Sequence, residues 1–401
     1  MEHRVVITGV GVCSALGNDS ATFWEALCAG RSGVRALPSP APDVPQPIGG
    51  AAPELPPWEG DKGNRRAPDR MIQLSYHAVA EALGGTLPPL PPATQLIWGT
   101  GYTSMATIEA CYEAWYLQGR VRADTVPACM PAAVLAHLTA AFGIRGMGTM
   151  VSASCASGLN AVGLGYHLVR AGIAPSVVAG SADAPLTAGM FRAWKPLRVM
   201  SGDHADAPRA CRPFSADRSG LVLAEGAGAL VLESLEQARR RGAPILAEII
   251  GFSGSSTGGS IVAPDVESQS ATLRDALEQA RVAPGDVDYI NAHATATKVG
   301  DAAEVRTIKQ VLGRRAASLP VSSIKGATGH AMGASSALET IATVLALRHQ
   351  ALPPTINWQP GDAECDLDCV PHRARPQALN IAVKESFGFG GANAAMVLRA
   401  A

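Results

Sequence analysis

The sequence is short of charge and of aromatic residues. Charged residues make up 17% and aromatic residues 5% of its 401 residues, whereas hydrophobic residues reach 47%. Its 33 lysines and arginines nearly balance its 34 aspartates and glutamates, which argues against a nucleic-acid or membrane-surface protein that relies on bulk charge. Because few charged residues are available to face water, most helices must be covered on several sides. This composition is typical of an α/β protein with a large core.

The sequence also lacks a recognisable targeting signal or membrane span. Residues 1–4 run directly into an expected strand at residues 5–7, which leaves no space for a signal peptide. No uninterrupted apolar run is long enough to cross a bilayer. The eight cysteines lack the spacing of a disulfide scaffold, and Cys365 and Cys369 have no second ligand pair, so we expect reduced thiols and no metal site. These absences predict a cytoplasmic protein.

The chain is too long for one compact core, and its pattern restarts in the middle. An expected strand at residues 245–250 begins a second succession of strand, long excursion, helix, strand, glycine-rich turn, helix and strand. We therefore predict two similar αβ halves, residues 1–244 and residues 245–401, packed against each other.

The first half contains a cysteine at an expected strand-to-helix turn. Residues 148–151 are typical of a buried strand, and residues 158–169 carry apolar side chains at helical spacing, so Cys155 precedes a helix. The positive end of a helix dipole favours a thiolate, and we expect it to lower the pKa of Cys155. A cysteine chosen at random is more often a small buried apolar residue, and two downstream motifs favour the functional interpretation here.

The second half contains two histidines, each where a strand runs into a loop. His293 follows a strand that begins near residue 288, and His330 ends residues 321–330, just before a helix of small residues. A single histidine is most often a packed or surface side chain. One cysteine with one histidine suggests a hydrolase or a transferase, whereas two histidines suggest donors aimed at a single carbonyl.

Taken together, these motifs resemble the β-ketoacyl-acyl-carrier-protein synthases of the thiolase superfamily, above all the elongating ketosynthases of type II fatty-acid and polyketide systems. The resemblance covers nearly the whole chain. Its motifs are the opening strand, Ser154-Cys155-Ala156-Ser157-Gly158, Arg212-Pro213-Phe214, His293-Ala294-Thr295, residues 325–330 and Gly388-Phe389-Gly390-Gly391. The resemblance implies an α/β, thiolase-like fold whose duplicated halves form five αβαβα layers.

The resemblance also implies a mechanism and a set of site residues. Cys155 would accept an acyl group from the phosphopantetheine of an acyl carrier protein, and His293 and His330 would donate hydrogen bonds to the thioester carbonyl of malonyl-acyl-carrier protein as carbon dioxide leaves. The resulting enolate would attack the acyl-cysteine. The backbone N–H groups of Cys155 and Phe389 would form the oxyanion hole, and the Phe389 side chain would gate the second substrate.

Further roles follow from family positions. Thr295 and Thr297 would bind pantetheine, although loop capping also explains them. Lys325 and Glu339 would form a charge pair behind the histidines. Arg65 and Arg66 would dock the acidic carrier protein. Asp301 and Glu304 are two acids at the start of an expected helix. Four apolar residues would line the acyl pocket: Met105, Ile108, Met190 and Leu221. We favour a structural role for the two acids, which a helix dipole would stabilise.

The sequence departs from the family pattern in four places. Ala294 replaces a glycine, Glu385 an asparagine, and Ala392 a threonine or histidine, and residues 255–260 lack a histidine that many relatives carry. None of these removes the cysteine or either of the two histidines. The departures suggest a specialised biosynthetic ketosynthase rather than the housekeeping fatty-acid enzyme.

Two other functions remain open at this point. A non-condensing partner subunit that sets chain length in a ketosynthase heterodimer usually lacks the cysteine, so Cys155 argues against it. A ketosynthase-like acyltransferase to a heteroatom nucleophile needs the cysteine but not both histidines. The resemblance implies no bound cofactor, an acyl carrier protein as partner, and a homodimer, with a heterodimer of related subunits as the alternative.

Overall fold

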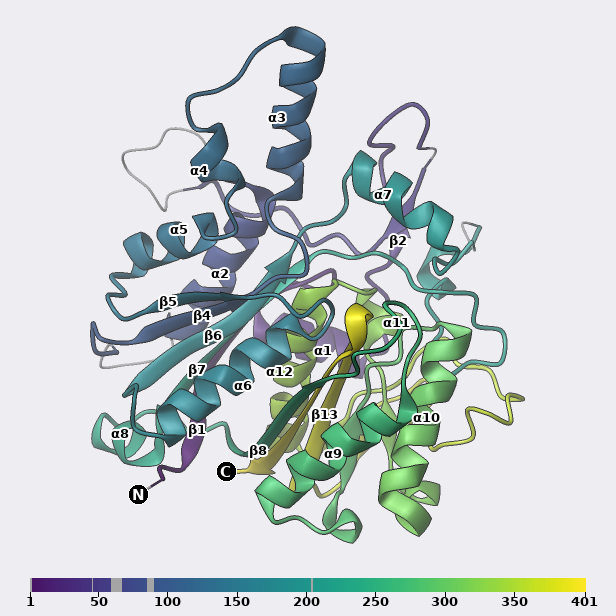
Figure 1. Ribbon diagram of the computed structural model, residues 1–401. Coiled ribbons are helices and arrows are strands. Elements are labelled where there is room, and N and C mark those ends of the chain that lie inside the picture. The colour runs from purple at the N-terminus through teal and green to yellow at the C-terminus, as the bar shows by residue number, and fades with distance from the viewer. Residues whose placement is uncertain (1, 45, 59–66, 85–89, 203–204) are drawn as a thin grey trace.

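The computed structural model describes residues 2–44, 46–58, 67–84, 90–202 and 205–401 (Figure 1). Among these residues, ten strands are linked by hydrogen bonds into one continuous sheet. In spatial order they are β10 (Val321–Ser322), β9 (Tyr289–Asn291), β13 (Ile381–Gly388), β14 (Ala392–Ala400), β8 (Ala247–Ser256), β1 (Val5–Cys13), β7 (Gly226–Ser234), β6 (Ser176–Asp183), β4 (Gln95–Gly99) and β5 (Gly148–Val151). Two short two-stranded sheets lie outside it, β2 (Arg35–Ala36) with β3 (Ile48–Gly49) and β11 (Ala351–Leu352) with β12 (Arg375–Pro376).

The strand order repeats when it is followed outward from the contact between β1 and β8. On one side β1, β7 and β6 are antiparallel neighbours, and β4 and β5 then add in parallel. On the other side β8, β14 and β13 are antiparallel neighbours, and β9 and β10 then add in parallel. This identical pairing supports the two predicted halves, and we propose that they divide near residue 244, just before β8.

Helices form three layers around the two halves of the sheet (Figure 1). Helices α2 (Arg70–Gly84) and α5 (Ala133–Phe142) cover the outer face of the first half, and α9 (Val266–Ala280) and α10 (Lys298–Leu312) cover that of the second. Between them lie α6 (Ser157–Arg170) and α12 (Gly333–His349), which contact strands of both halves. The predicted α/β class and its thiolase-like five-layer arrangement are confirmed.

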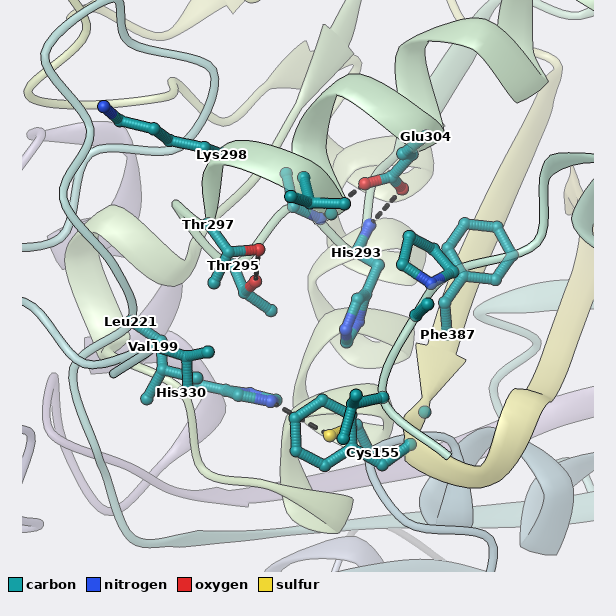
Figure 2. Close-up of a pocket in the computed structure, with 18 of the residues that line it drawn as sticks. Cys155, Val199, Leu221, His293, Thr295, Thr297, Lys298, Glu304, His330 and Phe387 are labelled. Atoms are coloured by element: carbon teal, nitrogen blue, oxygen red, sulfur yellow. Dashed lines mark hydrogen bonds between the residues drawn. The ribbon is translucent and has the colours of Figure 1, made fainter. Parts of the chain in front are cut away.

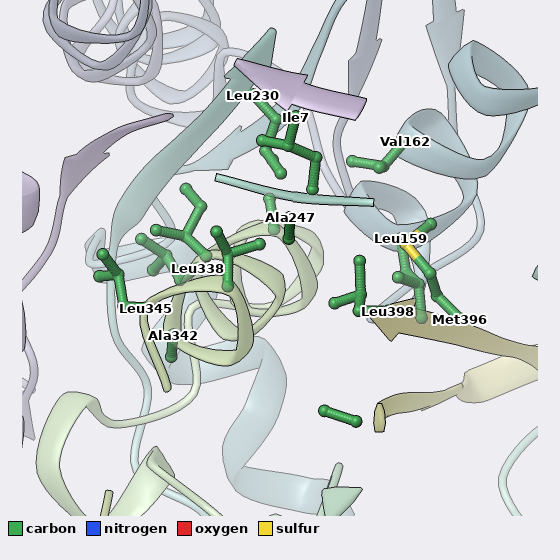
Figure 3. Packing of buried hydrophobic residues seen from close by; sticks show 14 of the residues in the cluster. Ile7, Leu159, Val162, Leu230, Ala247, Leu338, Ala342, Leu345, Met396 and Leu398 are labelled. Carbon is green, nitrogen blue, oxygen red and sulfur yellow. The ribbon is translucent and has the colours of Figure 1, made fainter. Parts of the chain in front are cut away.

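The central layer packs between the two halves because most residues of its helices are small or apolar. Every residue of α12 from Gly333 to Leu347 is buried, and its alanines, serines and threonines allow the neighbouring elements to approach closely. Leu338, Ala342 and Leu345 pack in the same cluster as strand residues from both halves (Figure 3). The largest hydrophobic cluster therefore lies between the halves and holds the starts of α6 and α12 in fixed positions.

The remaining helices are α1 (Ser20–Cys28), α3 (Met105–Gln118), α4 (Thr125–Cys129), α7 (Ala188–Trp194), α8 (Leu235–Arg240) and the short α11 (Lys325–Thr328), whose four residues are all buried. Helices α3 and α4 project from the body next to the β4–β5 edge (Figure 1). Within the described residues, none of the helices is both long and apolar enough to span a bilayer.

We predict that Gly11→Ala destabilises the protein. A Cβ at Gly11 would lie 1.9 Å from the Ala78 carbonyl oxygen on α2, so α2 would have to move off the sheet. Such overpacking costs roughly 1–3 kcal/mol of unfolding free energy. Differential scanning calorimetry should show a lower melting temperature. Gly285→Ala, which introduces a Cβ into open space, is the control, and an equal melting temperature for the two variants would contradict the packing argument.

Candidate active site

Cys155, His293 and His330 come together in one cleft (Figure 2). The Cys155 Sγ lies 3.1 Å from the His330 Nε2, and the two imidazole rings are nearly perpendicular, with centroids 5.5 Å apart. Within this group, one sulfur or nitrogen atom of each residue lies within 4.8 Å of the others. A sulfur from the first half and two imidazoles from the second can therefore contact a single thioester.

The turn before α6 presents the sulfur to the cleft. Cys155 follows β5 and stands two residues before α6, as the sequence predicts, and Ser154 adopts a left-handed conformation with φ of 50°. The Ser154 hydroxyl donates to the Phe389 carbonyl oxygen at 2.9 Å. Gly388 permits this contact, since a Cβ there would lie 2.9 Å from the Ala153 carbonyl oxygen. The nucleophile turn is thus attached to the end of β13.

The expected lowering of the Cys155 pKa is wrong. Burial raises the pKa of the thiol to about 12, and the nearby Lys325 ammonium and the Phe389 N–H counteract only part of this effect. The helix dipole is weaker than the loss of hydration at this depth, because water no longer stabilises the thiolate. Cys155 is therefore a thiol at neutral pH, with His330 placed to share its proton.

His293 is held in one tautomer by an ammonium group. The Lys325 Nζ lies 3.4 Å from the His293 Nδ1 and also donates to the His293 carbonyl oxygen and to Glu339. Because an ammonium has no acceptor, the Nδ1 must accept and the proton must reside on Nε2. His293 is consequently a fixed N–H donor on the side of the ring that faces the cleft.

Glu304 fixes the backbone beneath His293. Its two carboxylate oxygens accept the N–H groups of His293 at 2.6 Å and Ala294 at 2.7 Å (Figure 2). Burial raises its pKa to about 7. The favoured interpretation of Glu304 as a helix-start acid missed this positioning contact. Asp301 fits a structural role better, since it accepts the Phe214 N–H at 2.9 Å.

His330 is held less rigidly than His293. Its Nδ1 lies 3.0 Å from the Ser335 hydroxyl, which also accepts the Ala331 N–H at 2.8 Å. The hydroxyl keeps one proton and one lone pair, so it can serve either tautomer of the ring. His330 can therefore accept the Cys155 proton at Nε2 in one tautomer and donate from Nε2 in the other. Ser335 was not singled out in the sequence, because its contact crosses a helix start.

Burial and nearby cations keep both imidazoles neutral. The pKa of each histidine lies well below its usual value, first because the charged form loses its hydration and then because Lys325 repels it. Neutral histidines suit hydrogen-bond donation to a carbonyl.

Phe389 lies beside the sulfur at the end of β13. Its N–H interacts with Cys155, and its ring stacks on that of Trp194, with centroids 5.8 Å apart. Gly390 and Gly391 follow with positive φ angles, which turn the chain sharply back into β14. The amide therefore lies at the sulfur and the ring lines the cleft, and the two roles expected of Phe389 stay predictions.

Comparison with known proteins places this geometry in a family. The family models for the N-terminal and C-terminal domains of β-ketoacyl synthases match residues 2–238 and residues 246–359. The chain belongs to the β-ketoacyl synthase family. It is accordingly an acyltransferase enzyme.

Three relatives illustrate the range of this family. The ketosynthase is 39% identical over 406 residues to Nodulation protein E of Rhizobium sp. (strain N33), with all of both chains covered. It is 36% identical over 412 residues to 3-oxoacyl-[acyl-carrier-protein] synthase 2 of Coxiella burnetii, covering 99% and 98% of the two chains. A solved structure with a similar fold is AntDE:AntF, a type II PKS acyl-carrier protein in complex with its ketosynthase bound to the hexaketide. The superposition has a TM-score of 0.92 at 28% identity and covers all of both chains.

The cleft of this ketosynthase is a cavity of about 650 Å³. The hydroxyl oxygens of Thr295 and Thr297 lie 3.0 Å apart on its wall, and Leu221 lies across from them (Figure 2). Met190 packs with Leu221 and Trp194 in one apolar cluster, which Met105 also contacts. Ile108 instead lines a second cavity, of about 640 Å³, between α3 and α4. Arg65 and Arg66 lie outside the described residues.

Three buried charges lie behind His293. Glu339 pairs with the ammonium groups of both Lys325 and Lys384, and all three side chains are at most 1% exposed. Lys325 and Glu339 were expected here from the sequence, whereas Lys384 was not, because it lies in an ordinary strand pattern. Although Cys155, His293 and His330 could converge on a metal ion, two ammonium groups this close would repel a divalent cation.

The departures from the family pattern surround this layer. Glu385 is buried, and neither of its carboxyl oxygens has a hydrogen-bond partner among the described residues. Burial and the neighbouring Glu304 raise its pKa well above the usual value, so it is a neutral acid. Ala294 is buried and donates its N–H to Glu304, and Ala392 begins β14 opposite Gly388.

The buried thiol predicts how Cys155 reacts with iodoacetamide. Because only the thiolate is a nucleophile, alkylation should be slow at pH 7.5 and should rise about tenfold per pH unit up to at least pH 10. Peptide mass spectrometry measures the adduct at Cys155, and the Cys155→Ala variant gives the background from the other thiols. A rate that levels off near pH 7 would show a low thiol pKa and would contradict the burial argument.

Proposed function

We propose that this ketosynthase catalyses the decarboxylative Claisen condensation of an acyl group on Cys155 with malonyl-acyl-carrier protein, giving 3-oxoacyl-acyl-carrier protein. The observation that carries the proposal is the meeting of the Cys155 sulfur with two neutral imidazoles in one cleft. The names of the relatives support the reaction class, since one of them is a 3-oxoacyl-acyl-carrier-protein synthase.

Loading is the first step. The Cys155 thiol transfers its proton to the His330 Nε2, 3.1 Å away, and the sulfur attacks the acyl thioester of the carrier protein. The carbon–sulfur bond to phosphopantetheine breaks, and His330 returns the proton to the departing thiolate. The oxygen of the tetrahedral intermediate is held by the N–H groups of Cys155 and Phe389.

Condensation follows when malonyl-acyl-carrier protein enters. The Nε2–H groups of His293 and His330 donate to its thioester carbonyl, so the electrons of the broken carbon–carboxylate bond are stabilised as an enolate while carbon dioxide leaves. The enolate carbon attacks the acyl-cysteine and forms the new carbon–carbon bond, the bond from the acyl carbon to the Cys155 sulfur breaks, and the departing thiolate takes up a proton from the solvent. Each step uses residues that line the described cleft.

The substrates arrive on the phosphopantetheine of an acyl carrier protein, and the enzyme itself needs no bound cofactor. The solved complex between an acyl-carrier protein and its ketosynthase supports this partner. We propose that Thr295 and Thr297 hydrogen-bond the pantetheine arm, because both hydroxyls lie on the cleft wall. Docking through Arg65 and Arg66 remains a proposal from the sequence. Arg198 and Lys298 also line the cleft and suit the phosphate of the arm.

The two alternative functions are less well supported. A non-condensing partner subunit has no use for a cysteine that contacts a histidine at 3.1 Å. An acyltransferase to a heteroatom nucleophile has no use for a second histidine fixed as a donor by Lys325. The similarity to Nodulation protein E and the departures at Ala294, Glu385 and Ala392 support a specialised fatty-acid or polyketide pathway.

We further propose a cytoplasmic homodimer, with a heterodimer of related subunits as the alternative. All eight cysteines are free thiols, which suits a reducing compartment. Strand β5 ends the sheet without a further partner among the described residues. On α3, which projects next to this edge, Tyr112, Trp115 and Tyr116 stack on one another, and Trp115 and Tyr116 are 51% and 73% exposed. An apolar surface of this kind marks an interface.

The division of labour in the site predicts the phenotypes of three variants. Cys155→Ala should abolish acyl loading, measured by mass spectrometry of the protein after incubation with acyl-acyl-carrier protein. His293→Ala should keep loading but reduce decarboxylation of malonyl-acyl-carrier protein by about 100-fold or more, because one donor to the enolate is lost. His330→Ala should impair decarboxylation more than loading.

These outcomes separate the three functions. Absence of an acyl adduct on Cys155 in the unmodified enzyme would support the partner-subunit alternative. Product formation without release of carbon dioxide would support the heteroatom acyltransferase. Equal loss of both steps in His330→Ala would contradict the proposed roles of the histidines. Ser318→Ala, at an exposed serine whose hydroxyl hydrogen-bonds Arg315, is the control and should change neither step.

The exposed aromatic residues of α3 predict how the dimer can be broken. The double variant Trp115→Glu/Tyr116→Glu should be monomeric, because burying two carboxylates in the interface is unfavourable. Light scattering coupled to size-exclusion chromatography measures the mass. Ile173→Glu, at an exposed residue just after α6, is the control and should remain dimeric. A monomeric unmodified protein or a dimeric double variant would contradict the proposal.

A further inference from the structure

Lys384 places a second ammonium on a carboxylate that already has one. Its side chain is fully buried on β13, and its Nζ lies 2.8 Å from the Glu339 Oε2. The Nζ also donates to the Glu385 carbonyl oxygen. The other oxygen of Glu339 pairs with Lys325. One carboxylate therefore serves two ammonium groups, and the cluster carries a net charge of +1.

Burial of this second ammonium is unfavourable for the free energy of folding, and it is not needed for neutrality, because Lys325 alone would neutralise Glu339. Burial lowers the pKa of Lys384, and the contact with Glu339 and, to a smaller extent, the charge of Glu304 counteract this effect. An apolar side chain at this position would avoid the loss of hydration. The excess positive charge is therefore a candidate for a functional rather than a structural requirement.

The charge is directed at the two histidines. The Lys325 Nζ lies 3.4 Å from the His293 ring, and the effects of Lys325 and Lys384 both disfavour protonation of His293 and His330. The other titratable groups around the rings, or coupled to the groups that touch them, are Cys155, Asp183, Asp301, Glu304, Glu339 and Glu385. Glu385, whose pKa is raised well above its usual value, is neutral near pH 7. Glu304, whose pKa is about 7, is about half ionised there and offsets only part of the excess charge.

A neutral histidine is required for the proposed condensation, and the inference rests on that proposed function. A neutral N–H donor stabilises the enolate without giving up its proton. An imidazolium, in contrast, can protonate the enolate carbon. The products would then be carbon dioxide and acetyl-acyl-carrier protein, and the acyl group would stay on Cys155.

We propose that Lys384 is a positioning residue that, through Glu339 and Lys325, keeps the charge behind His293 and His330 positive, so that both rings stay neutral and the enolate condenses instead of being protonated. Lys384 touches neither substrate nor sulfur. It acts through the field of the charge cluster.

The test is a series of variants that changes the net charge of the cluster. The charge is +1 in the unmodified enzyme, 0 in Lys384→Met, +2 in Glu339→Gln and +1 in the double variant, because each change removes one unit charge. Titration of [¹³Cε1]-histidine-labelled enzyme by NMR, with His293→Gln and His330→Gln for assignment, measures the two rings directly. In Lys384→Met both should titrate about one pH unit higher than in the unmodified enzyme.

The reaction provides a second measurement. In Lys384→Met the ratio of acetyl-acyl-carrier protein to 3-oxoacyl-acyl-carrier protein should rise several-fold as the pH falls from 8 to 6, and the acid limb of condensation should move up by about one unit. In the double variant, the product ratio and the acid limb of condensation should both return toward the values of the unmodified enzyme. Lys309→Met, at an exposed lysine on α10 paired with Asp366, is the control and should change neither.

Each outcome decides the inference. Identical histidine titrations in Lys384→Met and Lys309→Met would overturn it. If Lys384→Met does not fold, Glu339→Gln replaces it and should lower the titrations, and a rise there would equally overturn the inference. Failure of the unmodified enzyme to release carbon dioxide would refute the proposed function, whereas the NMR titration would still test the charge cluster.

Discussion

The buried ammonium of Lys325 connects the parts of the active site that come from different elements. It lies at the start of α11 and contacts the ring and the carbonyl oxygen of His293, on the loop after β9, as well as Glu339 in α12. Because it can only donate, it decides which nitrogen of His293 carries the proton. Lys384 then adds β13, the strand that leads to Phe389, to the same carboxylate. The Glu339 carboxylate in α12 thus links α11 and β13, and through Lys325 it fixes the orientation of the His293 N–H donor.

The packing between the two halves of the sheet brings this charged layer to the sulfur. Helices α6 and α12 are both buried between the halves, and each begins close to a reactive side chain, Cys155 in one case and His330 in the other. Small residues at their starts allow a close approach: a Cβ at Gly158 would lie 2.8 Å from the Ala337 nitrogen. A larger side chain here would separate the two helix starts and thereby the sulfur from the imidazole.

Burial has opposite consequences for the groups in the cleft. It raises the pKa of the Cys155 thiol and lowers those of the histidines, so sulfur and rings are all uncharged before substrate arrives. The fixed charges stay one layer further back, in Lys325, Glu339 and Lys384. The reactive groups themselves are thus uncharged, and yet the charges behind them present a positive field to the anions that form during the reaction.

Local patterns in the chain were enough to predict the strands, the strand-to-helix turn at Cys155, the repeated order of elements and the two histidines at strand ends, because each depends on residues close together in sequence. Which of these groups meet in space became clear from the folded molecule alone. It revealed Glu304 and Ser335 behind the histidines, Lys384 on Glu339, and a thiol whose pKa is raised rather than lowered. Hydrogen-bond partners, burial and the net charge of a cluster depend on residues far apart in sequence, so no local pattern encodes them.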